Sequence, residues 1–145
     1  MNKITVPLRL LNLQDDGFHL LVEIVVFGEI KLAVVDTGAS RTVFDKALIE
    51  EHRDEIVLHE DPHVEDHQAT TLFSTSNAVL ATLPLIKIGG LKLKKYTAVG
   101  LDLQSVNETY QQLGHPAIVA ILGGDILLKY HAVLNYKKLR LKLYK

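Results

Sequence analysis

One short loop carries the residue types with the clearest chemical meaning. It follows the apolar run 32–35 and consists of Asp36, Thr37, Gly38, Ala39 and Ser40. The run predicts a buried strand, which places the Asp36 carboxylate at a strand end. Gly38 lets the backbone approach that carboxylate closely, and the Thr37 hydroxyl can form a hydrogen bond beneath it. The next two residues are small and leave room beside the acid.

Hydrolysis of an amide bond is the chemistry that such a carboxylate can perform when it is paired. One ionised group takes a proton from water, and one protonated group polarises the scissile carbonyl. Two aspartates about 3 Å apart share a proton, because like charges at that distance cannot both ionise. The chain has one Asp-Thr-Gly, so Asp36 needs a partner from another molecule. The competing interpretation is an ordinary turn, in which Asp and Gly are favoured for local reasons.

Apolar strands are expected on both sides of this loop in the sequence. Residues 20–27 and 30–35 are joined by Gly28 and Glu29, a two-residue link of the type that closes a tight hairpin. The second arm of the hairpin leads into the acidic loop. A later apolar run, 117–123, ends in glycine and precedes a predicted short helix.

Other segments also follow the period-two pattern of half-buried strands. Residues 4–10 alternate, with Ile4, Val6, Leu8 and Leu10 expected on one face and a proline that suits an edge strand. Residues 15–17 predict a turn, and Gly89 and Gly90 predict a second hairpin. The alternating leucines of residues 139–143 predict a terminal strand.

Helices are expected to be few and short. One is predicted from Asp45 to about Arg53, and one at Ser105, whose spacing to Glu108 matches a capping box. Gly114 is in position to end that second helix. A third is expected to start at Asp125.

The helices do not alternate regularly with strands, which argues against a parallel doubly wound sheet. We therefore expect a mainly β fold, a closed β-barrel or folded-over antiparallel sheet with one to three short helices. Residues 1–145 are expected to form a single domain, since this length can bury an autonomous core.

Composition excludes several classes of protein. With no cysteine, the chain has no disulfide framework, zinc-thiolate site or cysteine nucleophile. A net charge of −1, from 16 basic and 17 acidic residues, argues against a surface built to bind nucleic acid. No apolar run approaches the roughly 20 residues of a membrane span, and the N-terminus lacks the apolar core of a signal peptide. We expect a cytoplasmic protein.

A histidine-rich stretch offers a competing site. The alternating residues are His59, Asp61, His63, Glu65 and His67. On an extended strand they would share one face, and His with carboxylate can bind zinc or a similar divalent ion. The simpler interpretation is a solvated loop, so we expect no metal. Lysines that alternate with leucine near residues 87–95 and 138–142 are likewise expected to be the wet face of strands.

Together these features resemble the single-domain retroviral-type aspartic proteases, the retropepsins. The resemblance runs from the hairpin at 20–35 through the acidic loop and the Gly89–Gly90 hairpin to the final strands. It implies a homodimer in which each subunit gives its Asp36 to one active site, a peptide or protein substrate, and no cofactor. Ala39 and Ser40 would border the substrate channel. The strand residues implied to support the loop are Ile121, Leu122 and Gly123.

The resemblance has two departures. Retropepsins cover the cleft with a glycine-rich flap, but residues 54–87 contain no glycine. By position the flap lies within residues 66–82, with a substrate-binding tip at Ser74, Thr75, Ser76 and Asn77. Retroviral enzymes also have a bracing arginine where this chain has Gly124; Asp125 is the candidate replacement, although a helix-capping role is the simpler interpretation.

Three functions follow. The first is an aspartic endopeptidase that works through an Asp36 dyad. The second is a retropepsin-fold peptide-binding or dimerisation module that has lost catalysis, since fold alone does not guarantee activity. The third is a metal-dependent hydrolase that uses the His59, His63 and His67 face.

Overall fold

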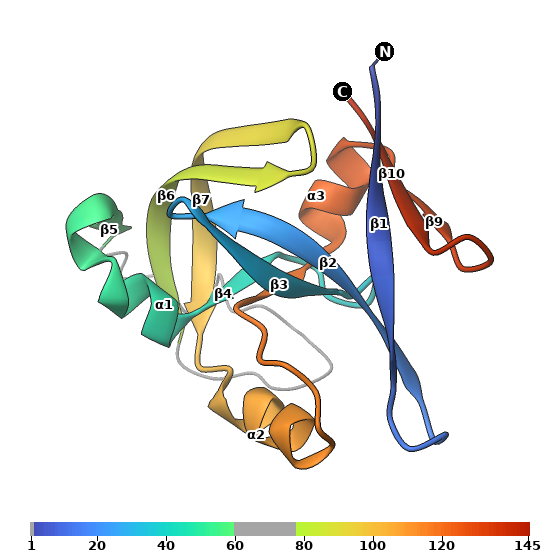
Figure 1. Cartoon of the computed structure of the whole chain (residues 1–145). Coiled ribbons are helices and arrows are strands. Elements are labelled where there is room, and N and C mark those ends of the chain that lie inside the picture. The colour runs from blue at the N-terminus through green and yellow to red at the C-terminus, as the bar shows by residue number, and fades with distance from the viewer. Residues whose placement is uncertain (1, 60–77) are drawn as a thin grey trace.

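A closed ring of strands forms the centre of the molecule (Figure 1). The computed structural model describes residues 2–59 and 78–145. Its strands are β1 (Lys3–Asn12), β2 (Phe18–Val26), β3 (Glu29–Val35), β4 (Val43–Asp45), β5 (Val57–His59), β6 (Val79–Ile88), β7 (Leu91–Leu101), β8 (Ala120–Leu122), β9 (Val133–Asn135) and β10 (Arg140–Tyr144). The helices are α1 (Lys46–Glu51), the 3-10 turn η1 (Arg53–Glu55), α2 (Gln104–Gln112) and α3 (Gly124–Lys129). The mainly β prediction is confirmed.

The barrel runs in the order β6-β7-β4-β8-β3-β2 and closes where β2 pairs again with β6. Beside the barrel, β1, β10 and β9 continue the order as a small side sheet, and the two termini lie next to each other there (Figure 1). Within the described ranges, no helix is long and apolar enough to span a membrane.

The hairpin predicted before the acidic loop is present as β2 and β3, with its turn one residue earlier than expected. Val26 pairs with Glu29, so the two turn residues are Phe27 and Gly28, with φ of 53° and 73°. Two consecutive positive φ values define a type I′ turn, whose twist matches that of the flanking strands. Glu29 therefore belongs to β3.

The buried side chains of β1 change from one face of the strand to the other along its length. Its first half pairs with β10 and its second half, from Leu8 onward, pairs with β2. Val6 and Leu8 are buried as predicted, but Leu10 is 43% exposed and Leu11 is buried instead. The expectation for Leu10 was wrong because β1 moves from the side sheet to the barrel.

The helix boundaries were predicted in part. Asp45 caps α1 by accepting a hydrogen bond from the backbone N–H of Ala47, and α2 ends before Gly114, which has φ of 78°. The capping box at Ser105 was wrong, because this residue lies inside α2 and Asp102 accepts the bond from the first helical N–H. Asp125 is also not the cap of α3, which begins at Gly124.

The strands nearest the acidic loop are buried on both faces. One apolar cluster contains Val35 and Leu122, and the other contains their neighbours Val34 and Ile121 together with Tyr110 of α2. Burial on both faces explains why these strands are apolar runs without alternation. The loop after β3 is therefore anchored in the interior of the protein.

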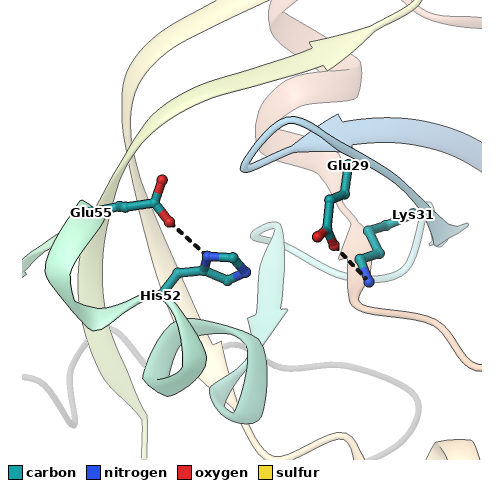
Figure 2. Close-up of polar contacts among 4 residues, drawn as sticks. All are labelled: Glu29, Lys31, His52 and Glu55. Carbon is teal, nitrogen blue, oxygen red and sulfur yellow. Dashed lines mark hydrogen bonds and ion pairs between the residues drawn. The ribbon is translucent and has the colours of Figure 1, made fainter.

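A contact between His52 and the hairpin turn ties α1 to the barrel. The His52 ring stacks on Phe27, with centroids 4.0 Å apart, and its Nδ1 is hydrogen-bonded to Glu55 at 2.7 Å. Figure 2 shows the His52–Glu55 pair beside the ion pair of Glu29 and Lys31 in β3.

We expect His52→Ala to lower the free energy of unfolding by about 1 kcal/mol, since a stacked ring pair is lost. Glu55→Gln should cost less than about 0.5 kcal/mol, because that partner is exposed. His52→Ala removes both contacts and Glu55→Gln only the ion pair, so the difference between their losses in denaturant unfolding measures the stack. Equal losses would mean that the ion pair, not the stack, holds α1 in place.

Candidate active site

Asp36 follows the last residue of β3 and is fixed by the strand beside it. β3 runs parallel to β8, with Val35 opposite Leu122. The backbone N–H of Asp36 donates to the carbonyl oxygen of Leu122 at 3.0 Å, which continues this ladder by one bond. The position of the acid is thus set by strand pairing.

Among the described residues, the Asp36 carboxylate has a hydrogen-bond partner on one oxygen only. The residue is 6% exposed, and its Oδ1 accepts a hydrogen bond from the backbone N–H of Gly38 at 2.9 Å. A Cβ on Gly38 would lie 3.2 Å from the same oxygen, so glycine suits this approach. Within residues 2–59 and 78–145, buried Oδ2 has no hydrogen-bond partner. A buried carboxylate oxygen without a partner is costly, and catalytic sites are a common place to find one.

Two cavities lie beside the acidic loop. The first, about 180 Å³, is lined by Asp36 itself together with Phe18, His19, Leu20, Val34, Val35, Thr37, Leu134 and Tyr136. The second, about 320 Å³, is mostly apolar and is lined by Thr37, Gly124, Leu127, Leu128, His131, Ala132 and Leu134. Thr37 and Leu134 border both, so the two cavities adjoin at the acidic loop.

Two further polar side chains near the acid were not identified from the sequence. His19 lines the Asp36 cavity, and its Nδ1 is hydrogen-bonded to the hydroxyl of Tyr110 at 2.7 Å. Burial, and to a smaller extent the charge of Asp36, raises the pKa of Tyr110 to about 12. Tyr110 therefore stays protonated near the acid. Because 91 residues separate it from His19, no local pattern could reveal the pair.

The raised pKa of Tyr110 predicts a loss of stability at high pH. The folded-state pKa lies above the ordinary value of 10.0, so the stabilisation is complete below pH 10.0 and is lost as the pH rises toward 12. The difference in unfolding free energy between wild type and Tyr110→Phe should therefore shrink above pH 10.0. Denaturant titrations at neutral and alkaline pH measure it, and a constant difference would contradict the assignment.

The acidic loop is closed from behind by the turn between β8 and α3. The backbone N–H of Gly124 donates to the carbonyl oxygen of Ala39 at 2.7 Å. A Cβ at Gly123 would lie 2.7 Å from the carbonyl carbon and oxygen of Arg41. Glycine at 123 is therefore required by close contact between two backbones.

Asp125 lies next to this contact and takes part in a partly buried hydrogen-bond group. It accepts from the backbone N–H and hydroxyl of Thr42 at 2.9 and 2.7 Å, and from the hydroxyl of Tyr96. Burial first, and then the bond to Asp125, raises the pKa of Tyr96 well above its ordinary range. Tyr96 is thus a donor throughout the physiological pH range.

The structure places the other predicted residues as follows. Thr37 and Ser40 are exposed, whereas the Ala39 side chain is 1% exposed and packs in the core. Ile121 and Leu122 are buried in β8 beside β3. The predicted flap tip, Ser74, Thr75, Ser76 and Asn77, lies outside the described residues.

Of the alternative metal face, only His59 lies in the part of the chain that the structure describes. Its Nε2 is hydrogen-bonded to the hydroxyl of Thr82 at 2.7 Å. His63 and His67 lie outside the described residues. Among the residues that are described, no group of three or more His, Cys, Asp or Glu side chains is arranged to hold a metal ion.

Comparisons with known proteins agree with this geometry. A family model described as aspartyl protease matches residues 22–126. A retropepsin-like aspartic protease from Rickettsia conorii superposes with a TM-score of 0.55 at 18% identity, over 99% of this chain and 91% of that one. The retroviral protease-like domain of Ddi1 from Leishmania major gives 0.51 at 13% identity, over 82% of each chain. No match was found among curated proteins.

The family match includes β3, the acidic loop and the Leu122–Gly123 turn, which are the parts that hold the Asp36 carboxylate. The two solved structures support the fold alone, because their sequences are only 18% and 13% identical to this chain. On this evidence the chain belongs to the aspartyl protease family and has a retropepsin-like fold.

Proposed function

We propose that this protein is an aspartic endopeptidase whose active site is completed by Asp36 of a second copy. One observation carries the proposal: Asp36, at a strand end, has a buried carboxylate whose Oδ2 is unpartnered among the described residues, and the residue lines a cavity. The family membership supports peptide-bond hydrolysis as the reaction.

The reaction uses one ionised and one protonated carboxyl group. The ionised Asp36 takes a proton from water, and the water oxygen attacks the carbonyl carbon of the peptide bond. The protonated Asp36 of the other copy gives its proton to the carbonyl oxygen, which forms a tetrahedral gem-diol. A proton then passes to the amide nitrogen, the C–N bond breaks, and a carboxylic acid and an amine leave. The Gly38 N–H holds Oδ1 throughout, which orients the acid.

A surface suited to the second copy surrounds Asp36. Three large apolar side chains that line the two cavities are well exposed: Leu128 at 78%, Tyr136 at 66% and Phe18 at 56%. Exposed apolar groups that gather around one point are typical of interaction sites. The unpartnered Oδ2 favours a second copy as the occupant, because it would supply the carboxyl group that the acid lacks.

The terminal strands are already paired within the chain. Asn2 and Lys145 exchange two backbone hydrogen bonds, and β1 pairs with β10 along residues 3–7. The strand order instead ends at β9, whose Leu134 borders both cavities. We therefore place the dimer contact on β9 and the apolar side chains beside it, not on the two termini.

Inhibitor titration during cleavage of an unfolded protein at acid pH tests the proposal. We expect cleavage that a pepstatin-type inhibitor blocks at one molecule per two chains, that a chelator does not affect, and whose specific activity falls on dilution. Cleavage abolished by the chelator would instead favour the metal-dependent hydrolase. A protein that binds the inhibitor but cleaves nothing would be the catalytically silent peptide-binding module.

A further inference from the structure

The carboxylate of Asp125 is the most heavily hydrogen-bonded side chain behind the acidic loop. Its Oδ1 accepts from the Thr42 N–H at 2.9 Å, from the Thr42 hydroxyl at 2.7 Å and from the N–H of Ile126 at 2.9 Å. Its Oδ2 accepts from the hydroxyl of Tyr96. Both oxygens therefore receive donors, and a carboxylate presents an acceptor on each side at once.

Thr42 connects this carboxylate to the active-site loop, by which we mean residues 36–42, the acidic loop together with the two residues that follow it. The residue is 2% exposed, and its hydroxyl donates to Asp125 while accepting from the backbone N–H of Gly123 at 2.9 Å. The loop is thus attached at its start by the bond from the Asp36 N–H to Leu122 and at its end by Thr42.

An asparagine at 125 would weaken these contacts. The amide has one oxygen, so its NH₂ group would face either the donors of Thr42 or the hydroxyl of Tyr96. Facing the Thr42 N–H, the NH₂ group loses a bond and adds repulsion. Facing Tyr96, it reverses the bond, because the hydroxyl must then accept and its own proton loses the acceptor that Asp125 supplied. Bonds to an ionised carboxylate are also about twice as strong as neutral ones.

We propose that Asp125 is the positioning residue for the active-site loop and that Tyr96 and Thr42 are its partners. Asp125 does not touch the reacting atoms. It fixes the end of the loop whose beginning carries Asp36, and so sets where that carboxylate points. The kinetic part of this inference rests on the proposed function, whereas the structural part does not.

Two pairs of variants test the role. Asp125→Asn is nearly isosteric, and Asp102→Asn is its matched control, since Asp102 is exposed and its carboxylate accepts from the first N–H of α2. Thr42→Val removes the hydroxyl, and Thr42→Ser restores it.

We expect kcat to fall roughly 10- to 100-fold in Asp125→Asn and Thr42→Val, the range seen when supporting partners of a site are lost, with KM changed much less. Tyr96→Phe, which removes one bond, should reduce kcat less than either. Asp102→Asn and Thr42→Ser should remain close to wild type. Wild-type kcat in Asp125→Asn, or an equal loss in Asp102→Asn, would overturn the proposal.

Hydrogen exchange separates this inference from the proposed function. In Asp125→Asn, backbone amides of residues 36–42 should exchange about tenfold faster or more, while those of β6 and β7 stay as in wild type. This readout needs no catalysis, so it can succeed in a protein that cleaves nothing. Unchanged exchange in the loop would mean that Asp125 does not hold it. Faster exchange everywhere would mean that Asp125 contributes to general stability only.

Discussion

Replacing Asp36 with asparagine is expected to lower kcat/KM for peptide hydrolysis by about 10³-fold or more, because the group that activates water is lost. The amide oxygen can still accept the hydrogen bond from Gly38, so the loop should keep its shape. The unpartnered position of Oδ2 becomes an NH₂ group, which cannot take a proton from water. Initial rates on an unfolded protein at acid pH measure the effect.

The control is Asp16→Asn, an equivalent change in an exposed turn far from the loop in sequence. It should leave kcat/KM unchanged, and the two variants should have similar unfolding midpoints. Activity in Asp36→Asn within tenfold of wild type would show that hydrolysis does not depend on this carboxylate.

Gly123→Ala is expected to have the largest effect on stability, a loss of about 3 kcal/mol in the free energy of unfolding. The added Cβ would meet the carbonyl group of Arg41 at 2.7 Å and the carbonyl oxygen of Ala39 at 3.0 Å. Both neighbours are backbone atoms of the active-site loop, which is hydrogen-bonded to the same turn through Ala39 and Thr42. The loop therefore has to move for the methyl group to fit.

The control for this variant is Gly17→Ala. A Cβ added at Gly17 would have the Leu13 side chain as its nearest neighbour, at 3.8 Å. That contact is ordinary, so the change should cost less than about 1 kcal/mol. Denaturant unfolding of both variants gives the two values. Equal midpoints would mean that the turn and the loop are not in the close contact described.

The sequence was informative wherever the structural signal is local. The β2–β3 hairpin and the strand leading to Asp36 could be predicted because apolar runs and a glycine-bearing turn are adjacent in sequence. The supporting strand was placed through resemblance, and it pairs with β3 over residues 120–122. The error at Leu10 arose because alternation predicts a face but not a change of pairing partner along one strand.

The interior of the site could not be predicted in the same way. Asp125 meets Thr42 across 83 residues and Tyr96 across 29, and each of these residues has an ordinary local explanation. Asp125 follows a strand in a position typical of a helix cap, so its actual role appears only once the fold brings the loop beside it. Gly124 departs from the retroviral pattern, and a Cβ added at this position would lie 3.3 Å from the carbonyl oxygen of Ala39.

Mixing wild-type and Asp36→Asn chains tests most directly whether one active site is built from two copies. If random dimers form and each needs two Asp36 carboxylates, an equal mixture at fixed total concentration should retain about one quarter of the wild-type activity. The account predicts this squared dependence on the wild-type fraction at every mixing ratio. Activity that falls in direct proportion to the wild-type fraction, one half in the equal mixture, would show that each chain carries a complete site and would contradict the account.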